Sequence, residues 1–162
     1  MTDKYIIRPL APQDVATALS LLPQLADFDV PQNRNSDDLW MGDAELLQSV
    51  ADGNAPESYV DVAVDEQDLV NGLVIITMRE ELMSHAPSAH LEAIVVVPTA
   101  RGTGLGKRLL THAEDSAQIR GAKSLSLHVF ANNHRARTLY DQQGYNSELI
   151  RATKWFDNSN QN

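Results

Sequence analysis

The chain contains no cysteine among its 162 residues. This absence excludes disulfides, thiolate metal sites and a cysteine nucleophile, and it makes the cytosol the default compartment. No apolar run approaches the roughly 18 residues that a membrane-spanning helix needs. The first residues also lack the long apolar stretch of a secretory signal peptide. We therefore expect a cytoplasmic protein with no membrane partner, whose chemistry rests on side chains other than thiols.

Basic residues are scarce as well, with 13 Lys and Arg against 22 Asp and Glu, and they are unevenly distributed. Residues 1–92 carry 4 basic and 17 acidic side chains, whereas residues 93–140 carry 7 basic and 2 acidic ones. An acidic surface of this size repels nucleic acid, so we expect no nucleic-acid partner. The basic region inside it suits a small polyanionic ligand.

The composition is otherwise that of a soluble globular protein, with 43% hydrophobic and 22% charged residues. A chain of this length fits one domain. We assign residues 1–157 to a single domain and expect the Asn, Ser and Gln residues of 158–162 to fray.

The spacing of apolar residues predicts alternating strands and helices. Strands are expected at 4–9, 58–64, 69–78, 90–97, 124–129 and 145–155, and helices at 12–26, from about 37 to the break at 53–56, at 104–120 and at 133–143. Ser36 or Asp37 is expected to cap the second helix and Gly144 to end the last. Residues 27–38 and 79–88 are expected to be loops. This order, β-α-α-β-β-β-α-β-α-β, predicts an α/β fold with a mixed sheet and helices on both faces.

The most informative segment is a glycine-rich loop between an apolar strand and a helix. The strand ends at Pro98, and the loop carries Arg101 with glycines at the alternate positions 102, 104 and 106. Glycines allow positive φ and bring main-chain N–H groups close to a ligand. The start of the helix adds unpaired N–H donors and the positive end of its dipole. The segment therefore predicts a seat for a phosphate or pyrophosphate.

Three kinds of glycine loop are candidates. A P-loop requires Gly-Lys followed by Ser or Thr, but Gly106 and Lys107 are followed by Arg108. A dinucleotide fingerprint requires G-x-G-x-x-G early in a βαβ unit, and this loop is G-x-G-x-G with no acidic residue at the end of a following strand. The third pattern, [Gln/Arg]-x-x-Gly-x-[Gly/Ala], is satisfied by Arg101-Gly-Thr-Gly104-Leu-Gly106.

On these residues the sequence resembles the GNAT family of N-acetyltransferases. A second match supports the resemblance, because residues 133–145 fit that family's Asn-x-x-Ala-x-x-Leu-Tyr-x-x-x-Gly-[Phe/Tyr] helix. The close match covers residues 90–146, about a third of the chain. The resemblance implies the GNAT acyl-CoA N-acyltransferase fold with a splayed sheet, and acetyl-CoA as co-substrate. We expect no metal, because the histidines lack ligand-like spacing and no HExxH pattern occurs.

The resemblance also implies which residues contact acetyl-CoA. The pyrophosphate is expected on the loop and helix start, at Arg101, Gly102, Thr103, Gly104, Leu105, Gly106 and Lys107. The pantetheine arm is expected beside the main chain of Ile94, Val95 and Val96. Asn133 is expected to cap its helix, to bond the pantetheine arm, or to do both, and Arg135 and Tyr140 are also expected to contact the cofactor. The leucines and alanines of the helix after the loop are expected to form core only.

Two residues are candidates for proton transfer. Glu92 stands where the resemblance implies a general base that acts directly or through water, although a glutamate on a solvated strand face, or one that shapes the acceptor site, would look the same. His90, on the same face, is a weaker candidate. Tyr140 matches the family's general acid, which lies beside the CoA sulfur.

The acceptor is expected to be a primary amine. The segments that would surround it are rich in acidic residues, namely Asp27, Asp29, Asp37, Asp38, Asp43, Glu80 and Glu81. A negative rim favours a cationic small molecule, lysine or N-terminal amine. The resemblance is also compatible with a homodimer. The alternative to an enzyme is a non-catalytic module that binds acetyl-CoA and regulates.

Overall fold

The computed structural model describes residues 4–157, so the expected fraying of residues 158–162 lies outside the described part. A five-stranded sheet runs through the molecule in the order β1-β2-β3-β4-β5. Its strands are β1 (Ile6–Pro9), β2 (Ser58–Val64), β3 (Val70–Glu80), β4 (Pro87–Val96) and β5 (Leu125–Leu127). The first four pair antiparallel, and β5 pairs parallel to β4. The prediction of a mixed sheet is confirmed.

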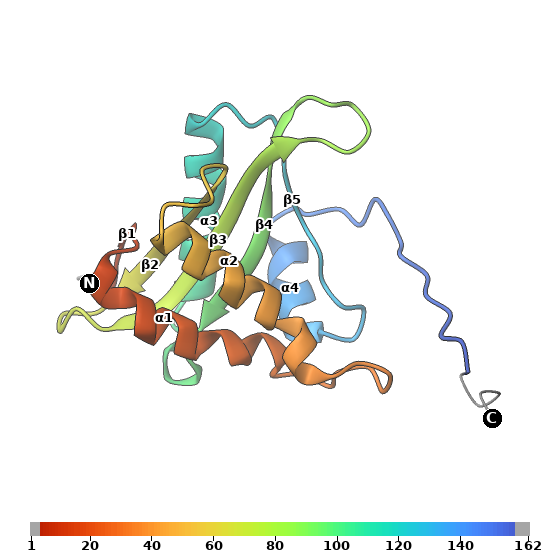
Figure 1. Cartoon of the computed structure of the whole chain (residues 1–162), viewed down its shortest axis with the longest axis horizontal. Helices are drawn as coiled ribbons and strands as arrows, with labels where there is room; N and C mark the ends of the chain where they lie inside the picture. The colour runs from red at the N-terminus through yellow and green to blue at the C-terminus, as the bar shows by residue number, and fades with distance from the viewer. Residues whose placement is uncertain (1–3, 158–162) are drawn as a thin grey trace.

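The helices cover both faces of this sheet, as predicted. Their bounds are η1 (Pro12–Asp14), α1 (Val15–Leu21), η2 (Leu22–Ala26), η3 (Ser36–Leu39), α2 (Met41–Ala51), η4 (Pro98–Ala100), α3 (Leu105–Ile119) and α4 (His134–Gln142), where η marks a 3₁₀ helix. In Figure 1, α1 and α2 lie in front of the sheet and α3 lies behind it. The sheet is thus the middle of three layers.

Alternation along the central strands builds a separate core on each face. On β3, Leu73 and Ile75 are buried with the residues of α1 and α2, whereas Val74 and Ile76 are buried with those of α3. Gly72 lets α3 approach the sheet closely, because a Cβ at this position would lie 2.9 Å from both a Leu109 methyl and the Val95 carbonyl oxygen. The close contact fixes where α3, and therefore the loop before it, sits against the sheet.

The first helical segment differs from the single helix expected at 12–26. It consists of η1, α1 and η2 in succession, and the chain tightens to 3₁₀ geometry at Leu22, next to Pro23. Proline has no N–H to continue the α-helical ladder, which explains the change. The expected cap is also wrong. Asn35 caps η3 by accepting a hydrogen bond of 3.0 Å from the Asp37 N–H, and α2 begins only at Met41.

The hairpin between β3 and β4 is longer than predicted. Arg79 pairs with Ser88 and Glu80 with Pro87, so the expected loop at 79–88 shrinks to residues 81–86. The Glu81 carboxylate closes the turn by accepting main-chain N–H groups of that loop. These strand ends were not predicted because their side chains are polar. The length of the strands here depends on cross-strand pairing and not on burial.

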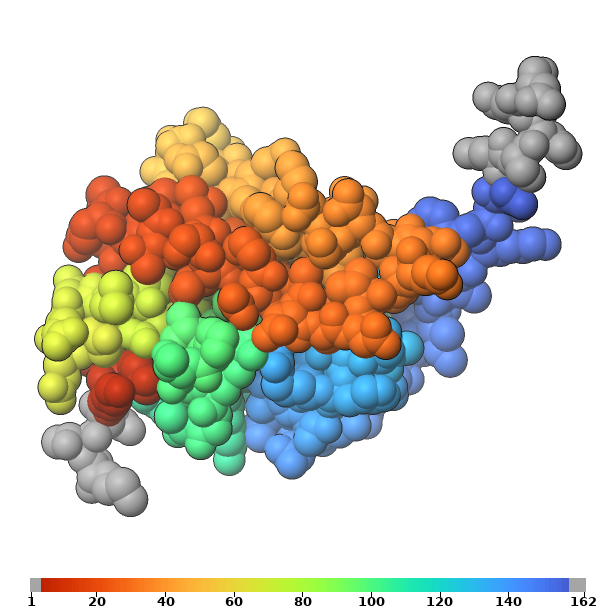
Figure 2. Space-filling view, turned by 90° about the horizontal axis from the view of Figure 1, so that it is seen from below, coloured from red at the N-terminus to blue at the C-terminus, as the bar shows by residue number. Residues whose placement is uncertain are grey.

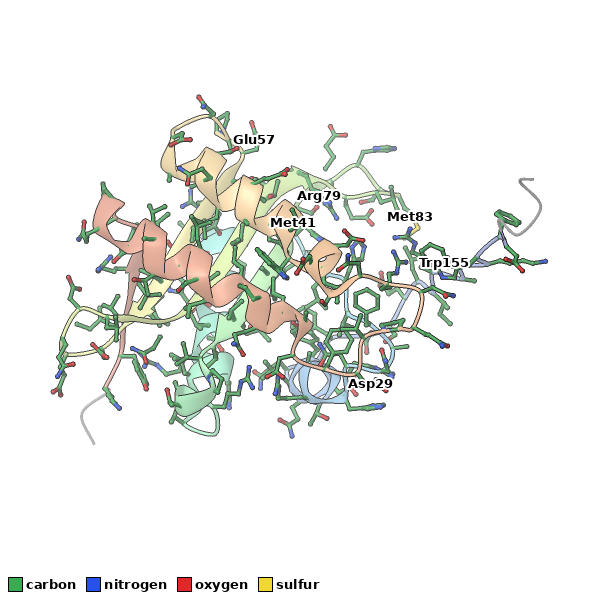
Figure 3. The ribbon with its side chains drawn as sticks, turned by 60° about the horizontal axis from the view of Figure 1, so that its bottom comes forward. Asp29, Met41, Glu57, Arg79, Met83 and Trp155 are labelled. Carbon is green, nitrogen blue, oxygen red and sulfur yellow. The ribbon has the colours of Figure 1, made fainter. Side chains whose placement is uncertain are left out.

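The strand expected at 145–155 is wrong. The α4 helix ends as expected at Gly144, but no strand follows it within the described residues. Leu149, Ile150 and Phe156 are 66%, 93% and 83% exposed. Figure 1 shows the segment running away from the sheet, and Figure 3 labels Trp155 on it. A strand needs a partner, and β5 offers only three residues of ladder.

No helix within residues 4–157 combines the length and the apolar character needed to cross a membrane.

Candidate functional site

A cavity of about 320 Å³ lies where β4 and β5 separate. Its wall comes from η2, η3, α2, β4, the glycine loop, the segment after β5, and α4. The lining residues include Gln24, Asp27, Phe28, Leu39, Asp43, Glu92, Ile94, Val96, Arg101, Gly102, Gly106, His128, Phe130, Asn133, Arg135 and Tyr140. Figure 2 shows three of these segments meeting at the surface: the chain after η2 (orange), the glycine loop (green) and the region of α4 (blue). Segments far apart in the sequence therefore share one cavity.

The two strands diverge because their pairing stops early. Only Ala89–Leu91 pair with β5, and β4 then carries a bulge at Glu92, since Ile76 pairs with Leu91 and Ile75 pairs with Ala93. A bulge bends its strand and re-aims the side chain of the extra residue. Glu92 therefore stands where the gap opens. The splayed sheet implied by the sequence resemblance is present.

Beyond the bulge, main-chain groups of β4 face the gap. The Val97 N–H donates to the Asn71 carbonyl on β3 at 2.9 Å. Hydrogen-bonding direction alternates along an antiparallel strand, so the N–H and C=O groups of Val96 and Ile94 point away from β3. One of them already has a partner, because the Val96 carbonyl accepts from Arg101 Nε at 3.3 Å. An extended ligand could pair with the others.

The glycine loop leads into α3 with an open helix start. Gly102 and Gly104 have φ values of +78° and +85°, which residues other than glycine rarely adopt. The space beside both glycines is open, because a Cβ on either would meet no atom within 4 Å. No side chain among the described residues caps α3, and the Arg108 N–H makes the first helical bond, to the Gly104 carbonyl at 3.1 Å. The N–H groups of residues 105–107 and the helix dipole thus favour an anion.

Arg101 is engaged by protein groups. Its guanidinium donates to Asp27 Oδ2 at 2.8 Å and to Gln24 Oε1 at 3.2 Å. Arg135 Nη2 lies 3.9 Å from the same Asp27 oxygen. The hydrogen bond from Arg101 and the charges of both arginines hold the pKa of Asp27 below its usual value. Arg101 therefore ties the glycine loop to η2, and both cations share one carboxylate.

Four of the predicted cofactor residues, Thr103, Gly104, Leu105 and Lys107, are not part of the cavity wall. The Leu105 side chain is 1% exposed and belongs to the α3 core. The Thr103 hydroxyl donates to the Ala100 carbonyl. The Lys107 side chain lies on a separate open groove with Arg108. What Leu105 and Lys107 offer a ligand at the helix start is therefore their main-chain N–H groups.

The other predicted residues do line the cavity. Asn133 caps α4 by accepting the Ala136 N–H at 3.4 Å. Tyr140 is 8% exposed, and its ring packs edge-on against Tyr145 at 5.9 Å between centroids. Burial raises the pKa of Tyr140 to about 12. The phenol therefore keeps its proton at neutral pH and can act as a proton donor.

The end of the cavity near the bulge is acidic. Asp43, from the first turn of α2, faces Glu92, whose side chain is 27% exposed. Burial, and then the charge of Glu92, raise the pKa of Asp43 to about 7. Among residues 4–157, neither carboxylate pairs with a lysine or arginine. From the sequence, Asp43 was expected only as one of several acidic residues around the acceptor. The amino-acid composition of this segment does not predict that α2 brings Asp43 close to Glu92.

Five of the seven acidic residues that were expected to surround the acceptor do not line this cavity. Glu80 and Glu81 belong to the β3–β4 hairpin and are absent from the wall, as are Asp29, Asp37 and Asp38. Within residues 4–157, no group of three or more His, Asp or Glu side chains is arranged to hold a metal ion. The expected absence of a metal stays a prediction.

Most of the chain matches the model of a known protein family. The model of the Acetyltransferase (GNAT) family matches residues 22–145, most of the chain. The chain belongs to the GNAT acetyltransferase family. The resemblance drawn from the glycine loop and the α4 motif is thereby confirmed, and so is the fold that it implied.

Relatives of this GNAT chain carry acetyltransferase names. The catalytic subunit ard1 of the N-terminal acetyltransferase A complex of Schizosaccharomyces pombe is 35% identical over 94 residues, 54% of this chain and 53% of that protein. The [ribosomal protein bS18]-alanine N-acetyltransferase of Salmonella typhimurium is 32% identical over 99 residues, 61% of this chain and 63% of that protein. The chain thus spans less than two thirds of either relative.

Among solved structures, a putative acetyl transferase from Pyrococcus furiosus superposes with a TM-score of 0.75 at 26% identity. That superposition covers 94% of this chain and 99% of the archaeal one.

Proposed function

We propose that this GNAT protein transfers the acetyl group of acetyl-CoA to a primary amine by direct attack in a ternary complex. One observation carries the proposal: a single cavity connects the open helix start at the glycine loop with a carboxylate at the β4 bulge and a protonated phenol on α4. These are the groups that seat a pyrophosphate, accept a proton and donate one.

The residues around the gap fit acetyl-CoA. Main-chain N–H groups at the start of α3 hold the pyrophosphate, with Arg101 and Arg135 supplying positive charge nearby. The main-chain groups of Ile94 and Val96 that point away from β3 pair with the amides of the pantetheine arm, as an added strand would. Asn133, at the cap of α4, borders the same path. When bound, acetyl-CoA supplies the activated acyl group.

The protein's own groups move the protons. Because an ammonium has no lone pair, Glu92 first takes one proton from the bound amine, directly or through water, and releases it to solvent. The neutral nitrogen then attacks the thioester carbon, and Glu92 accepts the second proton as the N–C bond forms. A main-chain N–H on the free edge of β4 polarises the carbonyl of the thioester and stabilises its developing negative charge. Tyr140 donates its proton to the sulfur as the C–S bond breaks. The products are the acetylated amine and free CoA thiol.

The acceptor amine is proposed to be cationic before it binds. Asp43 and Glu92 meet at the acidic end without a basic partner among the described residues, whereas Asp27 is occupied by two arginines. Leu39, Phe28 and Phe130 line the wall of the same cavity. A protonated amine on a partly apolar stem suits this lining, as in a peptide N-terminus, a lysine side chain or a small polyamine. Similarity to relatives named for N-terminal and alanine acetylation favours the first.

The test is release of CoA thiol from acetyl-CoA across an amine panel containing N-terminal peptides, lysine peptides, polyamines, aminoglycosides and acidic amino acids. We expect acceleration by cationic acceptors, with a preference that Asp43→Asn weakens and the surface control Asp52→Asn leaves unchanged. Acetyl-CoA binding by calorimetry without acceleration by any amine would instead indicate the non-catalytic module. A preference for acidic amino acids would contradict the proposed acceptor charge.

A cytoplasmic location, a homodimer and the assignment of residues 1–157 to one domain stay predictions from the sequence.

A further inference from the structure

His90 is a buried titratable residue for which the proposed chemistry has no role. It is 3% exposed and lies on β4, two residues before Glu92. Its Nδ1 atom is 2.8 Å from Arg79 Nη2 on β3 and 2.8 Å from Ser126 Oγ on β5. The ring of His128 packs edge-on at 4.7 Å between centroids. Three strands therefore hold this imidazole in place, with Arg79 labelled in Figure 3.

These contacts determine which ring nitrogen carries the proton. A guanidinium only donates hydrogen bonds, so Nδ1 must present its lone pair to Arg79. The single ring proton then sits on Nε2, and the ring is neutral. Burial, the charge of Arg79 and the neighbouring His128 together lower the pKa of His90 to about 4. His90 thus stays uncharged over the range in which most enzymes work.

The protonated nitrogen faces the proposed base. His90 Nε2 lies 4.0 Å from Glu92 Oε2, a separation that one bridging water or a small side-chain rotation spans. Asp43 on α2 also lies near Glu92 and is itself an acid, so it offers this carboxylate no positive charge. The neutral His90 N–H is accordingly the polar donor that the fold presents to this carboxylate from β4.

We propose that His90 is a positioning residue for Glu92: Arg79 and Ser126 fix it as a neutral Nε2–H donor, which orients the carboxylate without forming an ion pair. The inference rests on the proposed function of Glu92 as the base. A cation in this place would favour the ionised carboxylate and weaken it as a base. Arg79 prevents that by repelling a second proton on the ring.

Ring-nitrogen NMR on the full chain tests the tautomer without any activity measurement. We expect His90 to show the Nε2–H form from pH 8 to pH 5. In Arg79→Met the repulsion is lost, and the pKa of His90 is expected to rise by about one unit or more. The carboxyl carbon of Glu92 is expected to change its chemical shift over the pH range in which the His90 ring then gains its second proton. Arg120→Met, which removes an arginine from the ring of Tyr59, is the matched control and is expected to leave both NMR signals as in the wild type.

Activity variants test the positioning role. His90→Leu is expected to lower kcat about tenfold and to shift the acid limb of the pH profile, because Glu92 loses its orienting donor. His90→Gln keeps an N–H near the Nε2 position and is expected to restore most of the rate. Circular dichroism checks that both variants fold.

A ring that is charged, or protonated on Nδ1, at pH 7 would overturn the inference whatever the activity. Equal rates and identical pH profiles for the Leu and Gln variants would also overturn it. If the wild-type chain releases no CoA thiol with any amine, the proposed function fails instead. A Glu92 carboxyl signal that does not respond when the His90 ring gains its proton in Arg79→Met would then count separately against the link between the two residues.

Discussion

The two ends of the cavity treat charge in opposite ways. At the glycine-loop end, Arg101 and Arg135 both approach the carboxylate of Asp27, so one of their two positive charges is balanced within the protein. At the bulge end, Asp43 and Glu92 face one cavity with no basic side chain from residues 4–157 between them. The first end keeps a net positive charge that an anion can share, whereas the repulsion between the two carboxylates at the second end is relieved by a proton or a cation.

This difference matches the two ligands that the proposed reaction needs. An anion at the loop end finds preformed main-chain donors, and the two arginines can share their positive charge between it and the Asp27 carboxylate. A cationic amine at the bulge end replaces a repulsion with an attraction, which gives the acceptor a reason to bind close to the base. The comparison therefore predicts that variants at the bulge end change rate and stability, and that variants at the loop end change cofactor affinity.

The largest effect is expected from Glu92→Gln. An amide cannot accept the proton of the attacking amine, so kcat should fall by roughly 100- to 10,000-fold. Calorimetric affinity for acetyl-CoA should be unchanged, because the side chain lies at the opposite end from the glycine loop. Glu80→Gln, on the exposed end of β3, serves as the control. A rate close to that of the wild type would remove Glu92 from the mechanism.

A smaller loss, about 10- to 100-fold in kcat, is expected from Tyr140→Phe. The variant keeps the packed ring but loses the proton for the departing sulfur, so turnover should fall far more than acetyl-CoA affinity. Tyr145→Phe is the paired control, since its hydroxyl bonds Glu114 at 2.9 Å on α3. Stopped-flow thiol release compares the two. Equal rates for wild type and Tyr140→Phe would argue that solvent protonates the thiolate.

Asp43→Asn tests whether the ionised carboxylate of Asp43, buried beside Glu92, destabilises the folded chain. The pKa of Asp43 in the folded chain is raised to about 7, mainly by burial, so its contribution to stability is present below pH 4 and lost as pH rises through 7. Removing the carboxyl should therefore stabilise the chain at pH 8, by about 1–2 kcal/mol after screening by solvent.

Urea unfolding at pH 8 and pH 4 measures this effect. The wild-type and Asp43→Asn curves should converge at the lower pH. A variant less stable than the wild type at pH 8 would mean that Asp43 is not strained in the folded chain.

The two ends of the cavity also differ in how much of their structure could be predicted from the sequence. Gly102, Gly104 and the start of α3 are contiguous, and positive φ with an open helix start is a local property, so the loop end could be inferred directly from residue order. The bulge end needs α2 to pack over β4. The residues next to Asp43 and Glu92 in the sequence do not predict that contact. It depends on buried residues of the α1–α2 core such as Leu47.

The same distinction explains the errors in the fold. Strand ends at Glu80 and Pro87 form through pairing between polar residues, which hydropathy does not register. Apolar residues at Leu149 and Ile150 suggested a strand, yet apolar character supplies no hydrogen-bonding partner, and the segment stays exposed. The bulge at Glu92 was likewise invisible, because register depends on both strands. Patterns within one element were predictable, and relations between elements were not.

Asp27→Asn gives the smallest expected effect and probes the glycine-loop end. The amide can still accept hydrogen bonds from Arg101 and so keep the loop tied to η2, but it no longer offsets part of the positive charge of the two arginines. Acetyl-CoA should then bind about threefold more tightly at low ionic strength, and the gain should disappear at high salt because it is electrostatic. Titration calorimetry at two salt concentrations measures both quantities, with Asp29→Asn as the control. Weaker binding at both concentrations would mean that Asp27 acts by shaping the loop and not by holding charge in balance, and the contrast between the two ends would lose its electrostatic basis.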